Sequence, residues 1–182
     1  MFKPTPAQIE AARDKAIPDV IASDLRVLFC GINPSLYSAA IGHHFGRPGN
    51  RFWPVLHQAG ITDHQLSPFD DRQLLQHGIG ITNIVERATA RADEIADNEF
   101  IEGVKKLERK IATIHPCWLA VLGVTAYRVG FGQRKAVIGE QATRIDDTRL
   151  WVLPNPSGLN AHYQLGDLVR VYSDFFEVVG RC

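Results

Sequence analysis

Four short apolar runs, separated by helical patterns, constrain the fold of this chain more than any other feature. They lie at residues 25–31, 80–85, 117–123 and 150–153, and each is long enough for one strand of a sheet. The run at 117–123 is almost continuously apolar, as is typical of a parallel strand that is covered on both faces. Strands that alternate with helices predict an α/β domain built around a mainly parallel sheet.

The segments between these runs carry the signals of helices. Residues 97–114 show the clearest one, because their apolar side chains recur at steps of four and three and form a single stripe. Another helix is expected to begin at the Thr5-Pro6-Ala7-Gln8 capping pattern and to end near Pro18. Further helices are expected at residues 50–59, 70–76, 125–129 and 165–179, and residues 32–49 are expected to be irregular.

The length and composition of the chain are those of one ordinary globular domain. At about 150 residues per domain, 182 residues predict a single domain spanning 1–182, with residues 1–20 as an N-terminal helical extension. No apolar run reaches the length of a membrane span, and the N-terminus lacks the apolar core of a signal peptide. The three cysteines form no Cys-x-x-Cys pair, which argues against zinc-ribbon and redox functions. We therefore expect a cytoplasmic protein that does not contact membranes.

Two loops stand where an α/β sheet binds its ligands, beyond the carboxyl ends of the strands. The loop after the first run contains Asn33-Pro34, and the loop after the fourth contains Asn155-Pro156. Proline fixes its own φ and holds the preceding residue extended, so each asparagine has a defined pose. Taken singly, either Asn-Pro step could be only a turn signal. Neither loop has a nucleotide-binding glycine pattern, so no nucleotide cofactor is expected.

These loops resemble a known family. Residues 31–34, Gly-Ile-Asn-Pro, together with residues 155–159, Asn-Pro-Ser-Gly-Leu, are similar to motifs of the mismatch-specific uracil-DNA glycosylases, relatives of thymine-DNA glycosylase. The resemblance continues through residues 50–53, 80–85 and 151–154, and it covers roughly residues 25–176 in the family's order. It implies a three-layer α/β/α sandwich, and excision of bases from DNA without a cofactor or a metal.

The resemblance also implies roles in a base pocket. Asn33 would position the attacking water, and Phe45 would stack on the flipped base. Ile32, through its backbone, and Ser38 would line the same pocket. Ser35 stands where the uracil-only glycosylases carry a bulky tyrosine, so 5-substituted pyrimidines should enter more readily. Asn155 replaces a histidine of those enzymes, and it would be a weaker hydrogen-bond donor to the departing uracil.

A DNA contact is implied for the second loop. Leu159 would be the wedge that fills the space left by the flipped nucleotide, as apolar side chains do in other proteins that distort DNA. The alternative is a loop leucine that packs on the core. Gly158 and Asn160 would face the guanine opposite, and Ser157 would bind a flanking phosphate. Basic residues that could meet other phosphates are Arg47, Arg51, Arg87, Arg91, Arg134 and Lys135.

An amide orients water but cannot take its proton near neutral pH, so a carboxylate could assist Asn33. The candidates follow the second run: Glu86, Asp93 and Glu94. We favour Asp93 as an auxiliary base or cation stabiliser, with a solvated loop carboxylate as the alternative. The pair His43-His44 has no third ligand at a supporting spacing, so we expect a solvated or DNA-facing role and no metal.

The function predicted from these features is base-excision repair by a monofunctional DNA glycosylase. It would act as a monomer on mismatched or damaged double-stranded DNA. It would release uracil, with thymine and other damaged pyrimidines as further candidate substrates, and leave an abasic site. Neither motif holds a lysine for a Schiff base, so strand cleavage is not expected. The alternatives are a non-catalytic module that binds DNA lesions on the same fold, and a hydrolase of free nucleosides.

Overall fold

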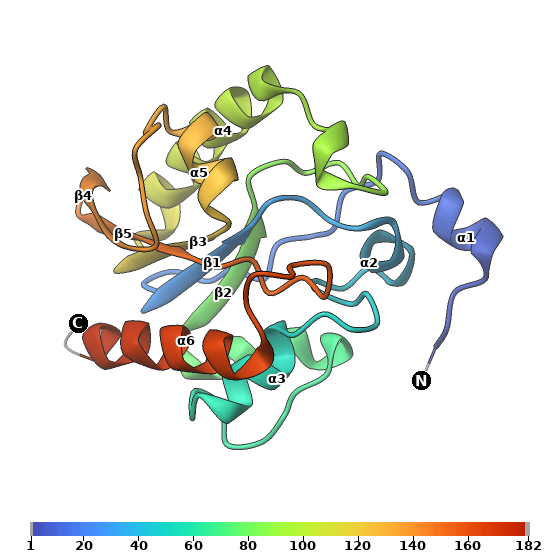
Figure 1. Cartoon of the computed structure of the whole chain (residues 1–182), viewed down its shortest axis with the longest axis horizontal. Helices are drawn as coiled ribbons and strands as arrows, with labels where there is room; N and C mark the ends of the chain where they lie inside the picture. The colour runs from blue at the N-terminus through green and yellow to red at the C-terminus, as the bar shows by residue number, and fades with distance from the viewer. Residues whose placement is uncertain (1, 181–182) are drawn as a thin grey trace.

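One five-stranded sheet forms the centre of the computed structural model, which describes residues 2–180 (Figure 1). The strand order is β2-β1-β3-β5-β4. The first four strands in that order run parallel, and only β4 is antiparallel to its neighbour β5. The strands are β1 (Val27–Gly31), β2 (Ile79–Asn83), β3 (Trp118–Leu122), β4 (Gly139–Ile145) and β5 (Thr148–Leu153).

Helices cover both faces of this sheet, which confirms the layered α/β fold (Figure 1). On one face lie α3 (Phe52–Gln58), the 3-10 helix η1 (Pro68–His77) and α6 (Leu165–Val179). On the other face lie α4 (Asp97–Ile114) and α5 (Val124–Gly130). None of the helices in the described part of the chain combines the length and the apolar character that crossing a membrane requires.

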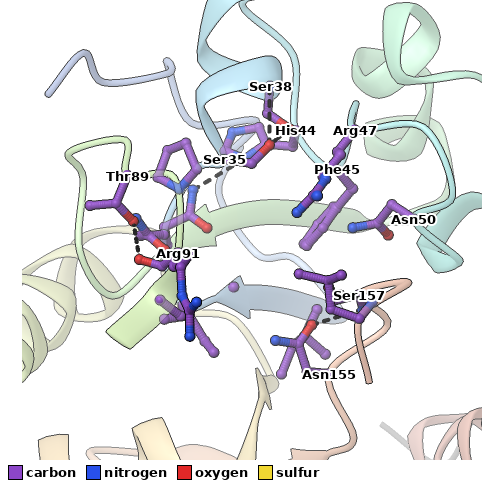
Figure 2. Close-up of a pocket in the computed structure, with 18 of the residues that line it drawn as sticks. Ser35, Ser38, His44, Phe45, Arg47, Asn50, Thr89, Arg91, Asn155 and Ser157 are labelled. Atoms are coloured by element: carbon purple, nitrogen blue, oxygen red, sulfur yellow. Dashed lines mark hydrogen bonds between the residues drawn. The ribbon is translucent and has the colours of Figure 1, made fainter. Parts of the chain in front are cut away.

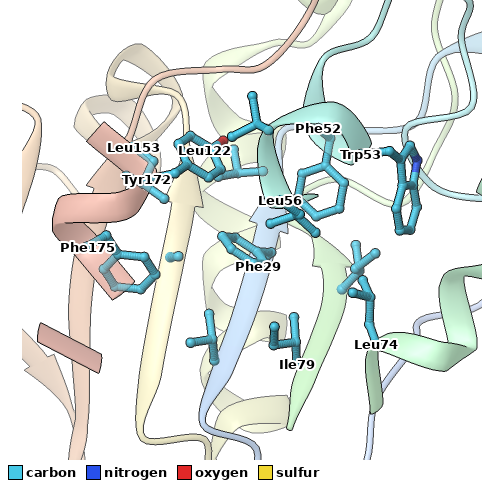
Figure 3. Packing of buried hydrophobic residues seen from close by; sticks show 14 of the residues in the cluster. Phe29, Phe52, Trp53, Leu56, Leu74, Ile79, Leu122, Leu153, Tyr172 and Phe175 are labelled. Carbon is cyan, nitrogen blue, oxygen red and sulfur yellow. The ribbon is translucent and has the colours of Figure 1, made fainter. Parts of the chain in front are cut away.

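The core explains why the apolar runs become strands. Every residue of β1, β2 and β3 is buried, because helices pack on both sides of them. Phe29 of β1 lies at the centre of one face, with its ring 5.3 Å from that of Phe52 and 6.1 Å from that of Tyr172 (Figure 3). Burying each such side chain contributes about 1.5–3 kcal/mol, so this aromatic cluster holds α3 and α6 on the sheet.

Several elements differ from the sequence prediction. Strand β2 ends at Asn83 and not at residue 85, and the short 3-10 helix η2 (Ala92–Glu94) was not predicted. The first helix, α1 (Pro6–Glu10), has the predicted Thr5 capping box but ends well before Pro18. A short helix, α2 (Leu36–Ile41), begins after Ser35 inside the segment that was expected to be irregular. Strand β4 was not predicted, because its residues alternate between exposed and half-buried positions at the edge of the sheet and include no apolar run.

The strand register brings the two Asn-Pro loops to one edge of the sheet. Gly31, the last residue of β1, pairs with Asn83, the last residue of β2. Leu122 of β3 pairs with Leu153 of β5 in the same way. The loops that follow β1, β2 and β5 therefore emerge at the same end of the sheet, where the parallel strands have their carboxyl ends.

Candidate active site

A cleft of about 370 Å³ lies at this edge of the sheet (Figure 2). Thr89 and Arg91 come from one side of it, and Asn155 and Ser157 come from the other. In residues 2–180, the lining includes no carboxylate, lysine or cysteine. The lining residues are Ile17, Gly31, Ile32, Asn33, Pro34, Ser35, Ser38, His44, Phe45, Arg47, Asn50, Asn83, Thr89, Ala90, Arg91, Ala92, Leu122, Asn155, Ser157, Leu159 and Asn160.

The amide of Asn33 has one fixed orientation. Its Nδ2 donates to the main-chain oxygen of Arg87 at 3.0 Å and to Oγ1 of Thr89 at 2.8 Å. A carbonyl oxygen only accepts hydrogen bonds, so the atom that faces Arg87 must be the nitrogen. The Thr89 hydroxyl donates in turn to the main-chain oxygen of Arg91 at 2.7 Å. Both amide hydrogens of Asn33 are thus engaged, and its Oδ1 is left as an acceptor for a ligand in the cleft.

The amide of Asn155 is fixed in the opposite sense. Its Oδ1 accepts the main-chain N–H of Ser157 at 3.0 Å (Figure 2), so its Nδ2 remains as a donor. The chain before it is anchored, because the buried Tyr172 of α6 donates its hydroxyl to the oxygen of Pro154 at 3.3 Å. The cleft therefore has an acceptor on the β1 loop and a donor on the β5 loop.

An aromatic surface lines the same cleft. The Phe45 ring stacks on Phe52, with centroids 4.0 Å apart and planes 25° from parallel. Phe45 has a φ of +52°, a strained region for a side chain of this size, and the stacking helps to hold it there. A Cβ added to Gly31 would stand 3.4 Å from the Phe45 ring, so the missing side chain leaves that ring accessible from the cleft.

Two further polar residues of the cleft were not predicted as site residues. His44 is buried, and one of its ring nitrogens, Nε2, lies 3.0 Å from the oxygen of Pro18, which fixes Nε2 as the donor. Its Nδ1 then accepts from Nδ2 of Asn83 at 3.3 Å, which leaves Oδ1 of Asn83 as a further acceptor. Burial lowers the pKa of His44 and keeps the ring neutral. The expectation of a solvated or DNA-facing His44 was therefore wrong.

Two serines shape the wall next to the Asn33 loop. Ser35 caps α2 by accepting the N–H of Ser38 at 3.1 Å, and its hydroxyl donates to that of Ser38 at 3.0 Å. The Ser38 hydroxyl also accepts the N–H of Gly46 at 3.0 Å, which joins α2 to the segment carrying Phe45. Both serines are small, and both line the cleft as predicted.

The loop after β5, residues 154–163, forms the rim. Leu159 is 70% exposed and does not pack in the core, so the alternative of a core leucine is wrong. The Ser157 hydroxyl accepts the N–H of Leu159 at 3.3 Å. The side chain of Asn160 braces the loop, because it donates to the oxygen of Asn155 and accepts from the N–H of His162. Gly158 belongs to this rim but does not line the cleft.

The structure places Asp93 at the mouth of the cleft, beside Arg47, Arg91 and Leu159, and not in the lining of the cleft itself. Its side chain is 63% exposed, and both of its oxygens receive N–H groups of Arg91, at 3.0 and 2.6 Å. Hydrogen bonding to Arg91 holds the pKa of Asp93 below its ordinary value, which makes it a poor base. Glu86 and Glu94 do not line the cleft either; Glu86 pairs with Lys106, and Glu94 pairs with Arg13.

The arginines predicted to contact phosphates fall into two groups, those at the mouth of the cleft and those held elsewhere in the protein. Arg47 and Arg91 line the mouth of the cleft, where the guanidinium of Arg91 is bound by the carboxylate of Asp93. The guanidinium of Arg51 is directed at the 154–163 loop, and that of Arg87 is held by Glu99 at 2.6 and 2.8 Å. These two arginines are engaged within the protein.

The part of the chain that forms this cleft is similar to known proteins. A family model described as the uracil DNA glycosylase superfamily matches residues 18–176. The solution NMR structure of a candidate uracil DNA glycosylase from Methanosarcina acetivorans superposes with a TM-score of 0.60. The two chains share 22% sequence identity, and the match covers 92% of this chain and 98% of that one. At this identity the structural match shows a shared fold, whereas the family match covers both loops of the cleft.

Proposed function

This chain belongs to the uracil DNA glycosylase superfamily, and we propose that it is a monofunctional glycosylase that hydrolyses the bond between uracil and deoxyribose in mismatched duplex DNA. Members of the superfamily are DNA glycosylases, which supports hydrolysis of a base from DNA as the reaction class. The mismatch preference and the acceptance of thymine are the more specific parts of the proposal.

The observation that carries the proposal is the opposed orientation of two amides in one cleft. Oδ1 of Asn33 is an unoccupied acceptor, suited to a hydrogen of the attacking water. Nδ2 of Asn155 is an available donor, suited to an oxygen of the base that departs as an anion. Because each amide is fixed by partners in the protein, neither has to reorganise as charge develops in the transition state.

The chemistry breaks the C1′–N1 bond and joins a water oxygen to C1′. The electron pair of the broken bond leaves with uracil, and the proton of the water passes to solvent, from which the base is reprotonated. In the described residues no carboxylate lines the cleft to take that proton, so we expect modest rates that rely on the leaving group. No lysine of residues 2–180 lines the cleft, which supports the absence of strand cleavage.

Recognition of the base follows from the walls of the cleft. Phe45 offers a face for stacking, which is worth about 1–3 kcal/mol per base and tolerates any pyrimidine. Oδ1 of Asn83 is an acceptor that suits the N3–H of uracil or thymine. The small Ser35 leaves room for substituents at C5 of the base.

The exposed Leu159 supports action on duplex DNA. An apolar side chain at the mouth of the cleft can fill the stack that a flipped nucleotide vacates. Flipping costs a few kcal/mol, and less where the base is already mismatched. A modest catalyst would therefore act first on mismatched uracil.

The absence of a carboxylate from the cleft of residues 2–180 also favours a second candidate, a non-catalytic module that binds DNA lesions. A measurement of base release distinguishes the glycosylase from the non-catalytic module. Labelled duplexes with uracil opposite guanine, uracil opposite adenine and thymine opposite guanine, and single-stranded uracil DNA, would be treated with wild type, Asn33→Ala and Asp93→Asn.

We expect release from the guanine mismatch, and a loss of about 10²-fold or more in Asn33→Ala with DNA binding retained. Asp93→Asn should keep most of the activity, since its exposed carboxylate lies at the mouth of the cleft and is held by Arg91. An equal loss in Asp93→Asn would return that carboxylate to the mechanism. Tight mismatch binding by wild type without release from any substrate would establish the lesion-binding module instead.

A further inference from the structure

Arg51 lies at the start of α3, and its guanidinium is directed at the 154–163 loop. Its Nη1 donates to the main-chain oxygen of Tyr163, and its Nη2 donates to that of Ser157. Nη2 also donates to the oxygen of Asn160 at 3.1 Å, and Nε donates to that of Pro156 at 3.4 Å. Four carbonyl oxygens of one loop thus converge on one side chain.

This arrangement suits arginine and no other residue type. The guanidinium is planar and carries five N–H groups in a fixed fork, and four of them are used here. A lysine has three donors on a single nitrogen and cannot reach four carbonyls that are spread along a loop. Carbonyl oxygens have no net charge, so Arg51 keeps its positive charge beneath a loop that we expect to meet DNA.

The main chain around Arg51 reinforces the contact. The N–H of Arg51 donates to the oxygen of Pro156 at 2.9 Å. A Cβ added to Gly158 would stand 2.6 Å from the oxygen of Gly49, so the two backbones touch directly. The segment that holds Phe45 and the loop that holds Leu159 are therefore joined at Arg51.

We propose that Arg51 is a positioning residue that holds the 154–163 loop, and with it Leu159, in the conformation that base flipping from duplex DNA requires. Leu159 itself is exposed and lacks packing that would orient it, so its position depends on the loop's main chain. Arg51 fixes that main chain at four points. The inference rests on the proposed function, and it replaces a phosphate contact as the role of this arginine.

The test compares duplex with single-stranded substrate, because a single strand has no stack for Leu159 to fill. For Arg51→Ala and Arg51→Lys we expect kcat/KM on the uracil–guanine duplex to fall about 10- to 100-fold, and activity on single-stranded uracil DNA to change little. Asn155 should keep its place in both variants, since Tyr172 anchors the chain at Pro154 and the main-chain N–H of residue 51, which neither substitution removes, still holds the oxygen of Pro156.

Arg26→Ala is the matched control, because Arg26 also donates to a main-chain oxygen, that of His77, at the opposite end of the sheet. It should lower neither activity. Leu159→Ala should reduce the duplex reaction by a similar factor, and the double variant with Arg51→Ala should be little worse than either single one. Amide hydrogen exchange should rise at residues 158–163 in Arg51→Ala and stay unchanged elsewhere, including at Ser157, whose N–H is held by Asn155.

Equal losses on duplex and single strand, or additive losses in the double variant, would overturn the proposal. If Arg51→Ala does not fold, the duplex-to-single-strand ratio of Arg51→Lys decides by the same criterion. If wild type releases no uracil, the proposed function fails on its own. Hydrogen exchange would then still show whether Arg51 holds the loop, and unchanged exchange in Arg51→Ala would refute the inference.

Discussion

Replacing Gly158 by alanine should separate the position of the 154–163 loop from the stability of the fold. The added Cβ would stand 2.6 Å from the oxygen of Gly49 and 3.2 Å from its carbonyl carbon. Ordinary contacts begin at 3.4 Å, so the two backbones must separate by about 0.8 Å, the difference between 3.4 and 2.6 Å. Neither partner is a flexible side-chain end, so the main chain itself has to move.

The size of the effect follows from that displacement. In a rigid core, such overlap would cost about 1–3 kcal/mol. The 154–163 loop lies at the surface and is free to shift outward, so we expect most of the strain to be relieved by movement of the loop. A misplacement of about 1 Å in a catalytic arrangement costs about 10²-fold in rate, and the predicted loss for Gly158→Ala is therefore about 10- to 100-fold in kcat/KM.

The assay is single-turnover uracil release from the guanine-mismatched duplex, with thermal unfolding measured in parallel. Gly166→Ala is the matched control, since a Cβ at Gly166 would have no neighbour within 4 Å. Alanine also suits its position in α6 better than glycine. If Gly158→Ala released uracil as fast as Gly166→Ala, the close contact with Gly49 would not determine the loop's position, and the reasoning would be refuted.

Two further predictions concern stability. Hydrogen bonding from Arg87 lowers the pKa of Glu99 from its ordinary 4.5 to about 2, so the stabilising ion pair should be complete above pH 4.5 and lost as the pH falls toward 2. The difference in melting temperature between wild type and Glu99→Gln should therefore be largest near neutral pH and shrink in acid. A difference that stays constant with pH would contradict this. Phe29→Ala should lose about 3–5 kcal/mol of unfolding free energy in a denaturant titration, because Phe29 is fully buried among four aromatic rings. Ile101 is exposed, so the unfolding free energy of Ile101→Ala should stay within about 0.5 kcal/mol of wild type. Equal losses in the two variants would contradict this assignment of the core.

The parts of the fold that could be predicted are those with a local signal. The apolar runs became β1, β2, β3 and β5, and the amphipathic stripe became α4 with the predicted bounds. Strand β4 has no such signal, because it is an edge strand whose side chains face solvent at alternate positions. Only its pairing with β5 makes it a strand.

The candidate site, too, could be predicted only where the sequence carries a local signal. Motif and strand order correctly brought Ile32, Asn33, Phe45 and Asn155 to one cleft, and their chemical roles stay predictions. Asn83 could have been suspected, since it is a polar residue inside the apolar run at 80–85. Asp93 was favoured because the resemblance places its loop near the cleft, but the position of a loop does not determine where its side chains point.

The sequence by itself determined the layered α/β fold, the superfamily and the two loops that form the cleft, because these depend on patterns a few residues long. Tertiary structure alone decided which atom of each amide is bound within the protein and which arginines are held by other parts of the chain. The partners of Asn33 lie 54 and 56 positions away, and those of Arg51 lie 105 to 112 positions away. A hydrogen bond orients a side chain only once the fold has brought its partner within about 3 Å, and no local pattern contains that information.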